Sequence, residues 1–135
     1  VDGAGMAAVF AAGADGIQMG TRFVSSKESP VHINFKNKIL ESNIDGTLML
    51  NKSSKPVIRA LKSELTHSID KKGIMDMADF MKIQELYFDG NMEAAPALSG
   101  QSVGLINEIK TVKQIIEEII NDFNKVCKKM GNTKF

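Results

Sequence analysis

Gly20 and Thr21 are the residues whose types and placement could most readily do chemistry. They follow a short apolar segment, Ile17–Met19, which comes after a small-residue helix that we expect to stop at Gly13. A glycine lets the backbone approach an anion closely, and the N–H groups that open the next helical turn attract negative charge. The loops after the last two strands of (β/α)8 barrels commonly form such a phosphate site. The pattern therefore predicts the last strand of an α/β barrel, although an ordinary strand-to-helix turn capped by Thr21 would look similar.

The length of the chain limits what it can form. A complete barrel needs roughly 250 residues, whereas this chain has 135, of which 43% are hydrophobic. That is enough for one small domain with a core, but not for eight strand–helix units. Because Val1 resembles sequence from the middle of an element, we expect the chain to be the C-terminal part of a longer protein.

Charge and cysteine content exclude several classes of protein. The 17 basic and 16 acidic residues give a net charge of +1, so no strong field favours nucleic acid or a membrane surface. No apolar run approaches the length that spans a bilayer. The single Cys127 excludes an intrachain disulfide and suits a reducing, cytoplasmic setting. We therefore expect no nucleic-acid and no membrane partner.

Helices are predicted over most of the chain by apolar spacing and capping residues. Asp2 can cap a first helix whose inner residues are Met6, Val9 and Phe10. Further elements are expected as a parallel strand over 14–19, a short helical turn over 21–26, a helix over 32–42 and an extended piece over 47–50. The four-residue steps of an apolar stripe predict one helix that starts at Pro56 and carries Val57, Leu61, Leu65 and Ile69.

The second half is predicted to end in the clearest helix. Asp76 or Asp79 can start a helix that ends near Gly90, and residues 91–104 are small enough to lie close to a ligand. Thr111 and Gln114 form a capping-box pattern. The helix that follows is expected to end at Gly131 and to have an apolar face made of Val112, Ile115, Ile116, Ile119, Ile120, Phe123, Val126, Cys127 and Met130.

Several blocks together resemble one known family. They are Asp2-Gly3-Ala4-Gly5-Met6-Ala7-Ala8, Gly13 through Phe23, Ser26-Lys27-Glu28-Ser29, His32 with Lys36, Pro56 through Lys62, and Gly100-Gln101-Ser102-Val103-Gly104-Leu105-Ile106. The sequence is similar to nitronate monooxygenases (2-nitropropane dioxygenases), a family that includes the flavin-dependent enoyl-acyl-carrier-protein reductase II. The first block is shared with other phosphate-binding barrels, whereas the last narrows the resemblance to this family.

The resemblance implies the C-terminal part of an FMN-binding (β/α)8 TIM barrel with a mainly helical C-terminal region. Residues 1–30 would supply the seventh helix, the eighth strand and the phosphate-binding turn. Residues 31–110 would form a helical and loop region near the active site, and residues 111–135 a final helix and tail. The family's paired glycines after the seventh strand and its catalytic histidine would lie before Val1, so no catalytic residue is assigned here.

The resemblance also implies a set of cofactor-binding residues. The backbone N–H groups of Gly20 and Thr21 and the Thr21 hydroxyl would bind the FMN phosphate. Met19 would pack near the flavin, unless it is plain core, and Gln18 would face the barrel interior, unless it points outward. Gln101 would offer its amide to the flavin ring from a segment that could equally be a helix-start turn.

The remaining candidates have simpler interpretations. His32 and His67 belong to no recognisable base constellation, and no group of residues has the ligands that a metal needs. Cys127 lies on the apolar stripe and is most simply core. Arg59 and Lys62 could meet an acidic carrier protein or a nucleotide phosphate, but a solvated helix face is the simpler expectation.

Two reactions compete within the family that the sequence resembles. One oxidises alkyl nitronates with dioxygen, and the other reduces an enoyl thioester with NAD(P)H as co-substrate. The partner would be a small-molecule or acyl-thioester substrate, and we expect a homo-oligomer. A different class of function is a truncated, non-catalytic module that self-associates through the apolar face of residues 112–130. A third is an inosine-monophosphate-dehydrogenase-like barrel that binds a nucleotide monophosphate.

Overall fold

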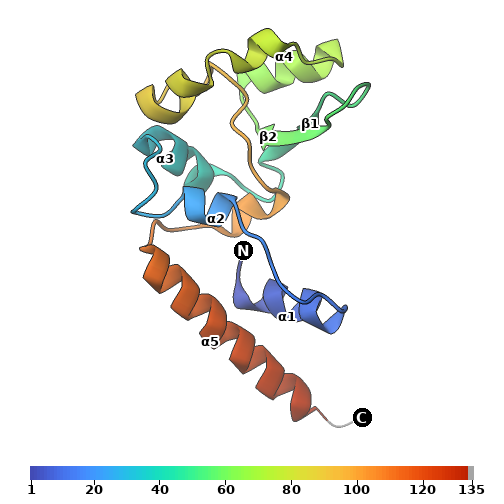
Figure 1. Cartoon of the computed structure of the whole chain (residues 1–135), viewed down its shortest axis with the longest axis vertical. Coiled ribbons are helices and arrows are strands. Elements are labelled where there is room, and N and C mark those ends of the chain that lie inside the picture. The colour runs from blue at the N-terminus through green and yellow to red at the C-terminus, as the bar shows by residue number, and fades with distance from the viewer. Residues whose placement is uncertain (134–135) are drawn as a thin grey trace.

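The computed structural model describes residues 1–133, which form helices and one small sheet (Figure 1). The helices are α1 Gly3–Ala11, α2 Thr21–Val24, α3 Ile33–Glu41, α4 Glu64–Lys72 and α5 Val112–Gly131, with shorter turns η1 Met77–Phe80, η2 Glu85–Asp89 and η3 Gln101–Leu105. The strands β1 Thr47–Leu50 and β2 Ile58–Leu61 form an antiparallel hairpin. Helices α1 and α5 lie side by side at one end, the hairpin and α4 lie at the other, and α2 and α3 lie between them. None of the helices in residues 1–133 combines the length and apolarity that a bilayer crossing requires.

Local capping explains why several helices begin where the sequence predicts. The Asp2 carboxylate accepts the Gly5 N–H at 2.7 Å, and the Thr111 hydroxyl and Gln114 amide bond reciprocally to open α5. α5 ends at Gly131, as predicted. The helix predicted up to Gly90 forms only as short 3-10 and π turns, and Gly90 ends the second of them in a left-handed conformation.

The predicted helix from Pro56 is wrong in its first half. Residues 58–61 form β2, which pairs antiparallel with β1 from Thr47↔Leu61 to Leu50↔Ile58. The chain over 97–99 hydrogen-bonds to the other edge of β2, with Leu61 N–H donating to Ala97 O at 2.8 Å. Pairing on both edges outweighs the helical spacing of the apolar residues, because residues distant in sequence supply the partners.

The helix α4 begins eight residues after Pro56, at a capping box formed by Ser63 and Thr66. Ser63 Oγ accepts the Thr66 N–H at 3.2 Å, and Thr66 Oγ1 accepts the Ser63 N–H at 2.7 Å. We expect Ser63→Ala to lower the free energy of unfolding by about 1 kcal/mol, because one N–H of the first turn loses its acceptor. Urea unfolding checks this against Ser68→Ala on the exposed side of the same helix. Equal effects of the two changes would contradict the role of the cap.

The strand predicted over residues 14–19 is not formed. These residues have no strand pairing, Asp15 lies in a bend, and Ile17 is 37% exposed. Within residues 1–133 the sheet contains only β1 and β2, and neither lies against this segment. A strand requires neighbours for its N–H and C=O groups. The prediction fails because the apolar pattern describes a strand whose partners are absent from the described residues.

Two clusters form the core of the described residues. One joins α3, η2 and the segment 95–106, with Phe35, Ile39, Leu86 and Val103 fully buried, and the other joins the hairpin to α4 through Ile69. On α5 only Ile115 and Ile119 are buried. Ile116, Ile120, Cys127 and Met130 are exposed, and so is Val9 of α1. The prediction that Cys127 is core is therefore wrong, because α1 covers only one side of the apolar face of α5.

Candidate functional site

The Gly20–Thr21 turn presents free donors. Gly20 immediately precedes α2, whose single turn spans Thr21–Val24. The Gly20 carbonyl accepts the N–H groups of Phe23 and Val24 at 2.9 and 3.0 Å. Within residues 1–133, the N–H groups of Gly20 and Thr21 donate to no group of the chain. Unpaired N–H groups at the start of a helical turn can bind an anion.

The Thr21 side chain joins this turn to a distant segment. Its Oγ1 accepts the Gly100 N–H at 2.8 Å and a longer bond of 3.4 Å from Ser99 Oγ. Both segments are recognisable in the sequence, but the contact between them is not. In this contact the hydroxyl oxygen already accepts the Gly100 N–H, so toward a ligand the hydroxyl is best placed to donate. Gly100 and Ser102 are thereby brought beside the turn.

A cavity of about 150 Å³ opens beside these donors. Gln18, Met19, Gly20 and Thr21 line it together with Val1, Arg22, Gly100 and Ser102. A Cβ placed on Gly20 would meet no atom within 4 Å, so an atom of a ligand can approach the backbone there. The open space and the free N–H groups fit a small anionic group such as a phosphate. The structure thus gathers four of the five predicted site residues.

Gln101 lies apart from those four. It lines a separate cavity of about 410 Å³ with Ile44, Ser102, Gly104 and Leu105. Ser102 borders both cavities. The assignment of Gln101 to the flavin site stays a prediction. The helix-start alternative is correct, since η3 begins at Gln101.

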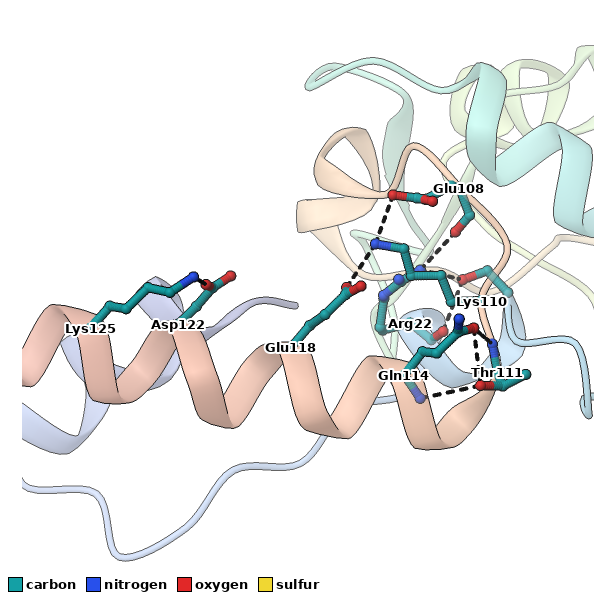
Figure 2. A network of polar contacts seen from close by, with 9 residues as sticks. Arg22, Glu108, Lys110, Thr111, Gln114, Glu118, Asp122 and Lys125 are labelled. Carbon is teal, nitrogen blue, oxygen red and sulfur yellow. Dashed lines mark hydrogen bonds and ion pairs between the residues drawn. The ribbon is translucent and has the colours of Figure 1, made fainter.

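Arg22, which also borders the cavity, was not singled out from the sequence. Its guanidinium is buried and donates to Glu108 O at 3.0 Å and to Ser25 Oγ at 3.4 Å (Figure 2). Burial lowers the pKa of Arg22, while Glu118 and Glu108 act in the opposite direction. Arg22 therefore anchors α2 to the segment before α5, which fixes the turn in place.

Lys110 completes this anchor. Its Nζ lies 2.7 Å from Glu108 Oε1 and 2.7 Å from Glu118 Oε2, and these hydrogen bonds raise its pKa (Figure 2). A lysine whose pKa is raised on folding stabilises the fold fully below its unfolded pKa of 10.5, and loses that contribution as pH rises through the folded value. The pair of carboxylates would then be left without its cation.

We therefore expect Lys110→Met to make the melting temperature depend less on pH in the alkaline range. The unmodified chain should lose stability above about pH 10 more steeply than the variant. Thermal unfolding between about pH 8 and about pH 11 measures this difference. Lys125→Met is the control, because the Lys125–Asp122 pair is exposed. Parallel profiles for the chain and Lys110→Met would contradict the assigned role.

Comparison of the sequence with known protein families identifies the family of this chain. The model described as nitronate monooxygenase matches residues 1–122. The chain belongs to the nitronate monooxygenase family. The match confirms the resemblance drawn from the sequence. Members of this family are oxidoreductases and typically depend on a flavin.

Solved and curated relatives agree with this membership. FabK from Thermotoga maritima is 37% identical with a TM-score of 0.89, covering 96% of this chain and 43% of that one. A methionine-to-alanine mutant of the same FabK is 39% identical with a TM-score of 0.83, covering 96% and 41%. A probable nitronate monooxygenase of Staphylococcus saprophyticus is 26% identical over 93% of this chain and 37% of its own length.

A third kind of relative is named for a different reaction. The (3aS,4S,5R,7aS)-5-hydroxy-7a-methyl-1-oxo-octahydro-1H-indene-4-carboxyl-CoA dehydrogenase of Mycobacterium tuberculosis is 24% identical, covering 90% of this chain and 46% of the relative. The chain therefore spans less than half the length of the relatives it matches. Its α/β fold matches that of FabK, a TIM-barrel enzyme.

Proposed function

We propose that the chain binds the phosphate of FMN at the Gly20–Thr21 turn, as part of a flavin-dependent oxidoreductase. The observation that carries the proposal is the pair of N–H groups without partners in residues 1–133, which border an open cavity. The Thr21 hydroxyl would donate a third hydrogen bond to the phosphate while it accepts from Gly100. Three converging donors suit a phosphate better than a neutral group.

We also propose where these residues sit in the barrel. α1 would be the seventh helix, and the segment 14–19 would become the eighth strand beside barrel strands like those of FabK. The apolar groove of about 480 Å³ next to this segment supports the proposal, because Met6, Val9, Ile17 and Leu105 line a surface suited to packing. The turn after residue 19 would then lie at the carboxyl end of the strand, where barrel enzymes hold their ligands.

The other predicted residues would orient the cofactor. Met19 would pack against the flavin, Gln18 would hydrogen-bond inside the barrel, and Gln101 would offer its amide from the neighbouring cavity. The flavin itself would supply the redox chemistry, while these side chains bind it and exclude water. The base that the reaction needs is not assigned to a residue of this chain.

For the whole protein we propose reduction of an enoyl thioester with NAD(P)H. The identity of 37–39% to FabK, against 26% to the probable nitronate monooxygenase, favours this reaction. Oxidation of alkyl nitronates with dioxygen is the second candidate, supported by the family description. Steady-state assays of the same preparation with an enoyl thioester plus NAD(P)H, and with a nitronate plus dioxygen, separate the two.

The phosphate proposal is tested by comparing FMN with riboflavin, which lacks the phosphate. A chimera in which this chain replaces the matching part of Thermotoga maritima FabK supplies the remaining barrel. We expect FMN to bind this chimera at least about tenfold more tightly than riboflavin, measured by quenching of flavin fluorescence. Equal affinities would refute the phosphate site.

The same titration addresses the other classes of function. A chimera that stays colourless with excess FMN, while the chain alone sediments as an oligomer, would favour the non-catalytic, self-associating module. Displacement of FMN by a purine nucleotide monophosphate, with tighter binding of that nucleotide, would favour the inosine-monophosphate-dehydrogenase-like alternative.

A further inference from the structure

Lys36 is a buried cation that the proposed function does not use. It lies in the middle of α3 and is only 6% exposed. Its Nζ donates to the carbonyl oxygens of Ser26 at 2.7 Å and Ser29 at 2.8 Å. It takes part in none of the ion pairs found within residues 1–133. Burying an ammonium group without a carboxylate is costly, so the two carbonyl dipoles must be held against it.

The loop between these two carbonyls anchors the start of α5. The Lys27 N–H donates to Lys110 O at 2.9 Å. The Glu28 carboxylate accepts the Val112 N–H at 2.9 and 3.0 Å, which adds a cap at the first residue of α5. Residues 27 and 28 can make these bonds only while the carbonyls on either side of them stay in place. Lys36 donates a hydrogen bond to each of those two carbonyls.

The same loop continues directly from the turn of the candidate site. α2 has only four residues, too few to be stable by itself, so its geometry depends on its surroundings. The Ser25 N–H donates to Thr21 O at 3.1 Å, and the Ser26 N–H donates to Phe23 O at 3.0 Å. A shift of the Ser26 backbone would therefore pass into α2 and reach Thr21.

We propose that Lys36 is a positioning residue whose ammonium fixes the 26–29 loop, and through it both the Gly20–Thr21 turn and the first turn of α5. The ammonium acts as a tethered internal cation held by backbone carbonyls. The part of this proposal that concerns flavin binding rests on the proposed function. The part that concerns the loop and α5 does not.

Hydrogen exchange on the full chain tests the positioning role. Lys36→Met keeps the length of the side chain and removes the charge. We expect exchange of the Lys27 and Val112 amides to rise about tenfold or more, while the Leu61 amide of the hairpin stays unchanged. Lys38→Met is the matched control on the same helix, because within residues 1–133 the Lys38 ammonium donates no hydrogen bond. Unchanged exchange at Lys27 and Val112, or an equal rise at Leu61, would overturn the proposal.

Two further measurements keep the proposal testable if Lys36→Met unfolds. On the unmodified chain, NMR should detect slowly exchanging ammonium protons of Lys36 with couplings to the carbonyl carbons of Ser26 and Ser29, and their absence would overturn it. In Lys36→Ala, added propylammonium should restore the slow exchange at Lys27 and Val112, whereas the same concentration of sodium should not. Failure of the rescue in a folded Lys36→Ala chain would count equally against it.

Flavin titration of the FabK chimera tests whether the 26–29 loop affects flavin binding. Lys36→Met is expected to lower FMN affinity about tenfold and to leave riboflavin affinity unchanged, because only FMN uses the turn. If exchange rises at the loop amides while FMN affinity is unaffected, the positioning of α5 stands and the link to the flavin site fails. If the chimera never prefers FMN over riboflavin, the proposed function fails while the exchange result still decides the role of Lys36.

Discussion

Thr21→Glu is expected to weaken FMN binding to the FabK chimera about 100-fold or more. A carboxylate at position 21 would lie within a few ångströms of the cavity that we assign to the phosphate. Two like charges at such a distance repel by several kcal/mol at a protein surface, and each 1.4 kcal/mol is tenfold in affinity. Fluorescence titration in low and high salt measures the loss, which should shrink as salt screens the repulsion.

Three controls separate this charge effect from simple damage. Thr21→Val removes the acceptor for the Gly100 N–H without adding charge, so it should cost FMN affinity far less than Thr21→Glu. Ser54→Glu adds the same charge in an exposed turn and should change nothing. Riboflavin should bind Thr21→Glu almost as it binds the unmodified chimera. If riboflavin affinity falls as steeply as FMN affinity, the phosphate is not at this turn.

The site could be predicted only as far as its parts are local. Gly20 and Thr21 are recognisable because a short apolar segment leads into them, and the structure does open a cavity there. The contact between Thr21 and Gly100 spans 79 positions in sequence, so spacing along the chain cannot reveal it. The same holds for Arg22, whose partner Glu108 lies 86 positions away. Positioning residues of this kind look like ordinary surface charges until the fold brings them together.

The secondary structure was likewise predictable only where its signals are local in sequence. Helices with their own caps, such as the one opened by Asp2, start as predicted because the signal lies within three residues. The helix predicted from Pro56 failed because residues 58–61 pair with β1 on one edge and with the segment 97–99 on the other. The strand predicted over 14–19 failed for the opposite reason, since no strand of the described residues lies beside it. Apolar spacing identified some buried residues, such as Leu61 and Ile69, but the pairing partners decided the secondary structure.

Gly3→Ala is expected to destabilise the chain, although alanine favours helices more than glycine does. Gly3 begins α1 where that helix packs against α5, and it is buried. A Cβ at this position would collide with the backbone of Ile119 and Phe123 and would lie 2.6 Å from the Asp122 Cβ. Backbone atoms cannot rotate out of the way, so the two helices would have to separate. Overpacking of this kind costs about 1–3 kcal/mol, more than the roughly 1 kcal/mol that helix propensity returns.

Gly131→Ala gives the matched control, because a Cβ at Gly131 in the last turn of α5 meets nothing within 4 Å. Urea unfolding should show Gly131→Ala equal to or slightly more stable than the unmodified chain and Gly3→Ala clearly less stable. The edge-to-face contact of Phe10 with Phe123, whose ring centres lie 5.6 Å apart, offers a second readout. The ring resonances of both should shift in Gly3→Ala as the helices move apart. A stabilised Gly3→Ala chain would mean that α1 and α5 do not approach as closely as the structure describes.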